Sequence, residues 1–376
     1  SIGLFYIIGL STFILANTFK DRIMNNKLIV FILYMISICF TLIFCNKTNF
    51  SPEVLIPKTG QTISVIAHDD GALKKGVSWP VPRFVDNRNG TITDKLTGLM
   101  WEKQPIRTKM NWEQSFHRIT HLNAISLGGH KDWRLPNILE LESLTNISQF
   151  DNSAWLIQKG FKGVQNGNYW SSTLLSGSEP INVQWCLDMG TSDLNISMRE
   201  YGLNVIGVRT AGQGVIKLPR TGQTKSIHRG DDGNMQIGVA HPNPRFIDNG
   251  NGTITDKLTG LKWEKSPPIE RVFIESSIQE RMNKLNRIKL GGFGDWRMPN
   301  RKEILSLVNF GQKELASWLN KQGFQKIQRD IYWTSSAISD KFWNNKRKVW
   351  CMDMKKGMLG IHFRLDYYIL AVRGGS

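Results

Sequence analysis

The chain has 376 residues, of which 40% are hydrophobic and 10% aromatic, and it carries a formal net charge of +17. This composition is enough for about two hydrophobic cores of ordinary size, which excludes a chain that stays unfolded. The charge is uneven, because residues 212–376 contain 28 Lys and Arg against 15 Asp and Glu, whereas residues 51–211 contain 16 against 15. Such an excess in one half of the chain favours a polyanionic partner.

Residues 1–50 have the layout of a secretory signal. Met24 begins a short basic segment, the apolar run Leu28–Phe44 follows, and Cys45 comes next. We therefore expect export, with Met24 as the true start and Cys45 as the residue that a bacterial lipoprotein would lipidate. An uncleaved membrane anchor is the alternative, since the apolar run has 17 residues, at the short limit for spanning a bilayer.

The rest of the sequence consists of two similar copies in tandem. Arg83–Lys103 reads RFVDNRNGTITDKLTGLMWEK and Arg245–Lys265 reads RFIDNGNGTITDKLTGLKWEK, with 18 of 21 positions identical. Shorter matches follow in the same order, among them DWRLPN and DWRMPN, YWSST and YWTSS, and WCLDM and WCMDM. A period this long predicts tandem globular domains, here residues 51–211 and 212–376, and excludes a solenoid of short repeats.

The doubled stretch predicts a β-hairpin. In the first repeat Phe84–Asp86 and Thr91–Thr93 read as strands joined through Asn89-Gly90, and Leu99–Trp101 reads as a third strand. The Asp and Asn residues of this stretch also suggest a calcium loop. They lack the regular acidic alternation and the distal glutamate of such loops, so turn chemistry is favoured.

Helices and further strands follow. Apolar residues at helical spacing predict helices over Trp112–Leu122 and 274–285, and a second helix over Ile138–Leu144 and Lys302–Val308. The tail of each repeat reads as a meander of short strands. The order predicts an α+β domain with a mainly antiparallel sheet and two helices. The abundant tryptophans are expected to be core anchors.

The motif DWR, before the second predicted helix, is assigned a structural role. Its acidic and basic residues are expected to form a partly buried ion pair that caps the corner between strand and helix. The residues of this structural motif are Asp132, Trp133, Arg134, Asp295, Trp296 and Arg297.

Together these motifs resemble the Lcl C-terminal domain family, named after the Legionella collagen-like adhesin. The resemblance rests on TGQT, DDG, RFxDNxNGTITDxxTGLxWEK, GGxxDWRxPN, YWSS and a final VR, and covers nearly all of 55–211 and 217–376. It implies two tandem C-type-lectin-like domains in an exported bacterial adhesin. It further implies binding to sulphated polysaccharide or extracellular matrix, and self-association into a homo-oligomer, because a member of the family forms trimers and binds sulphated glycosaminoglycans.

No arrangement of residues predicts an enzyme. Each repeat has one cysteine, Cys186 or Cys351, between apolar neighbours, and both are expected to be buried and unreactive. His117 and His121 lie four apart on a predicted helix, but no further ligand set accompanies them. We therefore expect no catalytic residue, no metal and no cofactor.

The strongest local signal for binding is the basic segment KFWNNKRK in the second repeat. Two more cations follow after the next strand, whereas the corresponding loop of the first repeat has no basic residue. Arg grips sulphate or phosphate oxygens with two donors, Lys acts as a point charge, and Trp could stack on a sugar ring. The predicted polyanion-binding residues are Lys341, Trp343, Lys346, Arg347, Lys348, Lys355 and Lys356.

Two functions therefore remain in view. The first is a surface adhesin that binds sulphated polysaccharide through the second repeat. The second is a non-enzymatic envelope module in which the lysines meet anionic lipid or a partner protein. Export argues against nucleic acid as the partner, and the membrane is expected to be contacted only through an N-terminal lipid or anchor.

Overall fold

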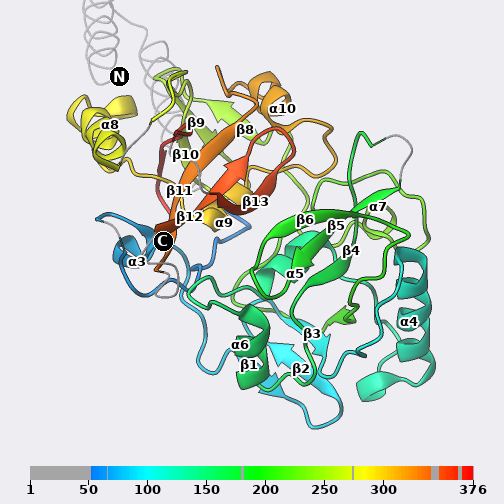
Figure 1. The fold of residues 1–376 in the computed structure, drawn as a ribbon. Helices are drawn as coiled ribbons and strands as arrows, with labels where there is room; N and C mark the ends of the chain where they lie inside the picture. The colour runs from blue at the N-terminus through cyan, green and yellow to red at the C-terminus, as the bar shows by residue number, and fades with distance from the viewer. Residues whose placement is uncertain are drawn as a thin grey trace, which may run out of the picture. The chain divides into compact units, whose positions relative to one another are not determined.

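The computed structural model describes residues 52–65, 67–178, 182–272, 275–339, 347–362 and 366–375 (Figure 1). The signal or anchor expected in residues 1–50 lies outside this part of the chain. Within the described ranges, no helix is both long and apolar enough to cross a membrane.

The two repeats have the same order of elements. The first contains α3 (Asp70–Leu73), β1 (Phe84–Asp86), β2 (Thr91–Asp94), β3 (Leu99–Glu102), α4 (Trp112–Ala124), η1 (Leu127–Gly129), α5 (Ile138–Ser143), α6 (Asn152–Gln158), β4 (Asn168–Leu174), β5 (Val183–Asp188), β6 (Leu194–Met198) and β7 (Val208–Thr210). The second contains α7 (Asp232–Met235), β8 (Phe246–Asp248), β9 (Thr253–Asp256), β10 (Lys262–Glu264), α8 (Glu275–Arg287), η2 (Leu290–Gly292), α9 (Arg301–Leu305), α10 (Leu315–Lys321), β11 (Ile331–Ser339), β12 (Arg347–Asp353), β13 (Met358–His362) and β14 (Val372–Arg373).

Each repeat has a four-stranded and a three-stranded antiparallel sheet. In the first repeat the strand orders are β1-β2-β3-β7 and β4-β5-β6. The expected hairpin is confirmed, with Phe84 opposite Asp94. The Asn87 amide donates to Thr91 Oγ1 at 2.8 Å, and Thr91 Oγ1 donates to Asn89 Oδ1 at 2.7 Å, so these amides hold the turn. The α+β class is therefore confirmed.

Each repeat has two helices that the sequence prediction missed: a four-residue one, α3 or α7, and a seven-residue one, α6 or α10. α6 follows an N-cap at Asp151, whose carboxylate accepts from the backbone N–H groups of Ser153 and Ala154 at 2.9 and 3.2 Å. α10 is its counterpart in the second repeat. The expected two helices per repeat are α4 with α5, and α8 with α9. The number two was too low, because α3, α6, α7 and α10 are short and lie within irregular segments.

One hydrophobic core runs through both repeats. Trp101 and Trp185 of the first repeat and Trp263 and Trp350 of the second are fully buried members of the same cluster. Trp185 meets Phe310 edge-on, with ring centroids 5.1 Å apart. These tryptophans are core anchors, as expected, and Pro52–Ser376 forms one compact unit.

The first leader, residues 52–82, binds the sheet of the second repeat. The Asp70 carboxylate at the start of α3 accepts a hydrogen bond from Ser336 Oγ of β11 at 2.8 Å. The neighbouring Ala337 N–H donates to Gln61 Oε1 at 2.9 Å. α3 accordingly lies beside β11 in Figure 1. The segment that opens the first repeat therefore completes the second.

The second leader, residues 214–244, makes the reciprocal contacts. The Asp232 carboxylate at the start of α7 accepts from Thr173 Oγ1 of β4 at 2.7 Å. Gln223 Nε2 donates to the carbonyl of Leu174 at 3.2 Å. Each repeat thus receives a buried carboxylate from the leader of the other.

The two ends of the described unit lie together. The backbone N–H of Val54 donates to the carbonyl of Leu258 in the second repeat at 3.3 Å. Pro52 packs so closely against Gly260 that a Cβ atom there would come within 3.1 Å of it. A Cβ atom built on Gly374 would likewise lie 3.9 Å from the carbonyl oxygen of Gly260.

Candidate functional site

The predicted polyanion-binding residues fall in three places. Three of them lie outside the described residues: Lys341, Trp343 and Lys346. Arg347 and Lys348 are the first two residues of β12. Lys355 and Lys356 lie in the turn between β12 and β13, and both are exposed.

The two described groups lie at opposite ends of one strand. β12 begins at Arg347 and ends at Asp353. At a rise of about 3.3 Å per residue, its ends are about 20 Å apart. Among the described residues, the backbone positions of the predicted site residues therefore fall into two groups, at opposite ends of β12.

The turn that contains Lys355 and Lys356 differs between the repeats in charge and not in shape. The Asp353 carboxylate accepts from the Lys355 N–H at 2.7 Å. The equivalent aspartate of the first repeat accepts from the Gly190 N–H at 2.8 Å and from the Thr191 N–H at 3.0 Å. Lys355 and Lys356 therefore occupy the positions of Gly190 and Thr191 on the same backbone.

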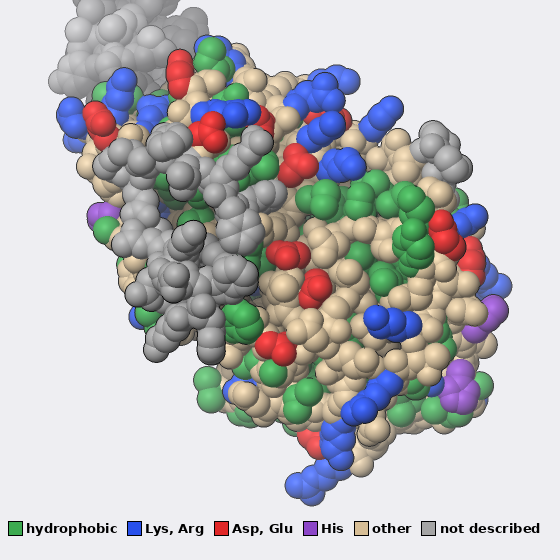
Figure 2. Space-filling model, viewed as in Figure 1, with side chains coloured by type: hydrophobic (Ala, Val, Ile, Leu, Met, Phe, Trp, Pro, Cys, Tyr) green, Lys and Arg blue, Asp and Glu red, His purple; other side chains and the backbone are tan. Residues whose placement is uncertain are grey.

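α10 adds cations to this part of the surface. The N–H of Leu315, its first residue, donates to the carbonyl of Lys355 at 3.1 Å, so helix and turn are in contact. Lys313, Lys321 and Lys326, on and around α10, are exposed and have no ion pair among the described residues. Figure 2 shows Lys and Arg side chains gathered on the part of this face that α10 occupies in Figure 1. We call Lys313, Lys321, Lys326, Lys355 and Lys356 the α10 basic surface.

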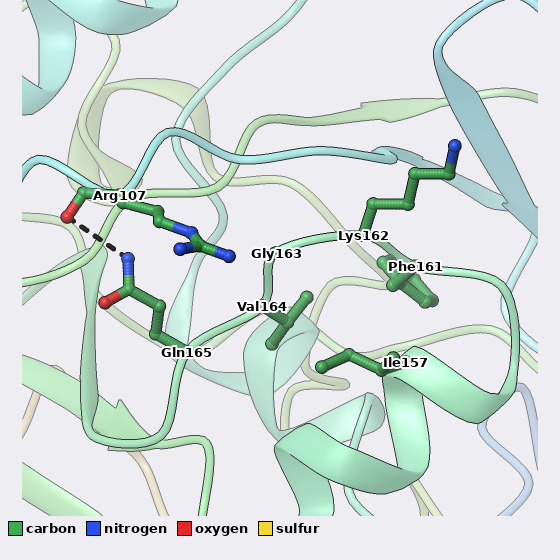
Figure 3. A pocket seen from close by; sticks show the side chains of 7 residues that line it. All are labelled: Arg107, Ile157, Phe161, Lys162, Gly163, Val164 and Gln165. Atoms are coloured by element: carbon green, nitrogen blue, oxygen red, sulfur yellow. Dashed lines mark hydrogen bonds between the residues drawn. The ribbon is translucent and has the colours of Figure 1, made fainter.

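The first repeat has a hollow of about 450 Å³ that the sequence analysis did not anticipate (Figure 3). It lies between the loop after β3 and the segment that joins α6 to β4. Arg107 and Lys162 stand on its rim, and Ile157 and Val164 line it. A comparison of the two repeats position by position could have indicated the hollow, because Arg107 and Ile157 of the first repeat correspond to Ile269 and Asn320 of the second.

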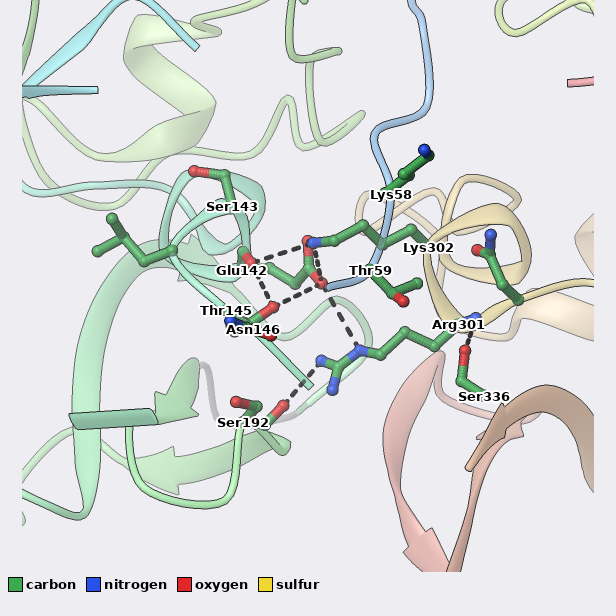
Figure 4. Close-up of polar contacts among 12 residues, drawn as sticks. Lys58, Thr59, Glu142, Ser143, Thr145, Asn146, Ser192, Arg301, Lys302 and Ser336 are labelled. Carbon is green, nitrogen blue, oxygen red and sulfur yellow. Dashed lines mark hydrogen bonds and ion pairs between the residues drawn. The ribbon is translucent and has the colours of Figure 1, made fainter. Parts of the chain in front are cut away.

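Two cations of the second repeat are buried between the repeats (Figure 4). Lys302 Nζ donates to both carboxylate oxygens of Glu142 at 2.8 and 2.9 Å. The Arg301 guanidinium lies 3.9 Å from the ring centroid of Trp350 and donates to the carbonyl of Ser192 at 2.7 Å. Burial lowers the pKa of both cations, and the Glu142 carboxylate opposes that shift.

This network explains part of the charge difference between the repeats. Arg301 and Lys302 begin α9, at the positions where Ile138 and Leu139 begin α5, and Leu305 occupies the position of the buried glutamate. The two surfaces are therefore complementary in charge. Some of the excess positive charge of the second repeat faces the first repeat and is unavailable to a partner. The replacement of two apolar residues by cations, and of the glutamate by leucine, can be read from the sequence. That these residues pair with each other across the two repeats can be seen only in the structure.

The ion pair expected inside the DWR motif is wrong. Arg134 donates to both carboxylate oxygens of Glu140 in α5, at 2.6 and 2.5 Å, and Asp132 pairs with Arg209 of β7 at 2.7 Å. Trp133 between them is buried. The aspartate and the arginine thus bind different elements. The second repeat has the same arrangement at Asp295, Trp296 and Arg297.

The cysteines are buried, as expected. Cys186 and Cys351 are free thiols inside the two repeats. Burial raises the pKa of Cys186 to about 12 and also raises the pKa of Cys351. Among the described residues, no group of three or more His, Cys, Asp or Glu is placed to hold a metal ion.

Comparison with known families gives one match. The model of the Lcl C-terminal domain matches residues 90–209 and 252–373, one range in each repeat. No curated protein matches the chain. The matched ranges run from the β1–β2 turn to β7 and from the β8–β9 turn to β14, and together they cover more than half of the sequence. The chain therefore belongs to the Lcl C-terminal domain family and contains two tandem copies of that domain.

Proposed function

We propose that the protein is an exported, surface-associated adhesin that binds sulphated or otherwise anionic polysaccharide through its second repeat. Membership of the Lcl C-terminal domain family supports an adhesin-like role at a surface. The observation that carries the choice of ligand is the pair Lys355 and Lys356, exposed on the same turn that holds Gly190 and Thr191 in the first repeat.

The arrangement of the cations fits a long polymer. Each exposed ion pair contributes only about 0.2–1 kcal/mol, so a small anion gains little from one or two lysines. A polyanion contacts many cations at once and can follow the surface from α10 along β12 towards Arg347 and Lys348. Because these contacts are solvated, salt is expected to weaken binding steeply.

The proposal includes a mode of action and a mode of attachment. The protein acts by binding and has no catalytic step, which agrees with the burial of both thiols. Each repeat has the C-type-lectin-like fold that the sequence resemblance implies. Attachment to the cell surface takes place through lipidated Cys45 or through an uncleaved anchor in the same segment.

The test is retention on immobilised heparin over a salt gradient. Lys355→Gly with Lys356→Thr places the residues of the first repeat in the turn of the second, on a backbone that already accepts them. At up to about 1 kcal/mol for each lost contact, affinity falls by up to about thirtyfold. The variant is expected to elute at clearly lower salt than the unmodified protein.

A control with the same change in net charge separates a local site from a general effect. Lys131→Gly with Lys159→Thr removes two exposed lysines of the first repeat and is expected to leave retention nearly unchanged. Equal losses in the two variants would contradict the proposed site. Binding to vesicles of anionic lipid without retention on heparin would instead support an envelope module.

A further inference from the structure

The two leaders are held by the same chemistry. The Asp70 carboxylate of the first leader accepts from Ser336 Oγ at 2.8 Å, and the Asp232 carboxylate of the second leader accepts from Thr173 Oγ1 at 2.7 Å. Ser336 and Thr173 are hydroxyl residues at corresponding positions of YWTSS and YWSST. Because both contacts join a carboxylate to a hydroxyl group, they do not distinguish a first repeat from a second.

The charged residues between the repeats, in contrast, differ on the two sides. Lys302 Nζ donates to both carboxylate oxygens of Glu142 at 2.8 and 2.9 Å, as Figure 4 shows. Asp193 is a second acid of the first repeat at this face, because a Cβ atom built on Gly360 of β13 would lie 3.3 Å from Asp193 Oδ1. Burial raises the pKa of Asp193, and the Arg301 cation opposes that shift. Two acids of the first repeat therefore meet two bases of the second.

The corresponding positions of the opposite repeat carry no charge. α5 and α9 begin at equivalent residues. The turns before β6 and β13 also match, since the Ser192 N–H donates to the Asp188 carbonyl at 2.8 Å and the Gly357 N–H donates to the Asp353 carbonyl at 2.8 Å. All four counterparts are apolar and lie in or against the hydrophobic core. They are Leu305 for Glu142, Met358 for Asp193, Ile138 for Arg301 and Leu139 for Lys302.

A pair of like repeats would therefore bury charges without partners. Two first repeats would place Glu142 and Asp193 of each copy opposite apolar residues of the other. Two second repeats would do the same with Arg301 and Lys302. A buried charge that loses its counter-charge is strongly destabilising, whereas the unlike pair contains two acids and two bases.

We propose that Glu142, Asp193, Arg301 and Lys302 form a selective pairing surface, through which a first repeat accepts a second repeat and rejects another first repeat. The exposed connector at 211–213 then keeps the two repeats in equal number and is not needed to hold them together. The pairing surface shares no residue with the α10 basic surface. Pairing of the repeats and binding of polysaccharide can therefore fail independently of each other.

The experiment cuts the connector of the full chain. A recognition site for a specific protease is inserted between Gly212 and Gln213, and the cut protein is incubated in urea and returned to buffer. Native mass spectrometry then identifies the pairs, because the two pieces differ in mass. Pairs of unlike pieces are expected to exceed pairs of like pieces at least about a hundredfold, since each like pair leaves several buried charges without a partner.

Matched variants test whether the charges make this choice. Glu142→Leu, Asp193→Met, Arg301→Ile and Lys302→Leu together give each position the residue of the opposite repeat and should let the pieces pair at random. Glu142→Lys alone should weaken the unlike pair at least about tenfold. Adding Lys302→Glu should restore it, which a general loss of folding would not allow. Glu200→Lys, the same change at an exposed acid of the first repeat, should have no effect.

Random pairing of the unmodified pieces would overturn the proposal. It is equally overturned if the pieces separate after the cut and do not pair again, because the connector would then be what holds the repeats together. Unchanged selectivity in the variant with four substitutions would also contradict it, since other contacts, such as those of the leaders, would then make the choice.

Discussion

The two buried carboxylates that the leaders place in the opposite repeats, Asp70 and Asp232, should make the folded protein more stable in mild acid than at neutral pH. Burial is the main cause that raises the pKa of Asp70 and of Asp232 from 3.8 to about 6, against the hydrogen bonds that lower it. Neighbouring carboxylates, Glu303 beside Asp70 and Glu140 beside Asp232, raise it further. The folded state therefore favours the protonated form of each group.

The magnitude follows from the shift. A change of about 2 pKa units corresponds to roughly 3 kcal/mol for each site, at about 1.36 kcal/mol per unit. Because the folded pKa lies above the unfolded one, this stability is fully present below about pH 4, declines between about pH 4 and 6, and is lost above that range. About half of it remains at pH 5. The unfolding free energy should thus be higher at pH 5 than at pH 8.

The assay compares urea unfolding at pH 5 and pH 8 for the unmodified protein, Asp70→Asn, Asp232→Asn and the double variant. Each asparagine keeps an acceptor for the hydroxyl groups and cannot ionise. Each should therefore reduce the difference in unfolding free energy between the two pH values, and the double variant should reduce it most. Glu264, with its pKa raised to about 7 mainly by burial, contributes in the same direction in all four proteins. A difference that is the same in all four would refute the reasoning.

Two further predictions concern buried groups. Glu142→Leu leaves Arg301 and Lys302 buried without the Glu142 carboxylate, and should lower the free energy of unfolding in urea by about 3–5 kcal/mol. Adding Arg301→Ile and Lys302→Leu should recover most of this loss. No recovery would show that the three charges do not act as a unit. Cys186 and Cys351 of the native protein should resist alkylation by iodoacetamide at pH 8, because their raised pKa keeps both thiols protonated and burial blocks access. Rapid modification of either of these two cysteines, located by peptide mass spectrometry, would contradict this.

Local structure was predictable where a few neighbouring residues determine it. The hairpin over Phe84–Asp94 follows from Asn89-Gly90, and the helix at Trp112–Ala124 follows from its apolar spacing. The α6 helix was missed because it has only seven residues, and its start at Asp151 resembles an ordinary turn.

The pairing of side chains was not predictable from neighbours in sequence. Asp132 and Arg134 were expected to form an ion pair with each other, but the fold brings each of them to a different partner that is more distant in the sequence. The contact of Glu142 with Lys302 joins residues of different repeats. It can be recognised only in the folded structure, where one hydrophobic core contains residues of both repeats. The charge count of the second repeat therefore includes Lys302, although this side chain is buried and paired with Glu142.

The position of Pro52 and Gly374 beside the same glycine of the second repeat has a mechanical consequence. Tension that enters at residue 52 and leaves near residue 375 passes directly through the second repeat, since the hydrogen bonds of Val54, Gln61 and Asp70 fasten the first leader there. Because the chain enters and leaves the load path within the second repeat, the first repeat then does not carry this force. Its hollow would keep its shape while the molecule is under traction.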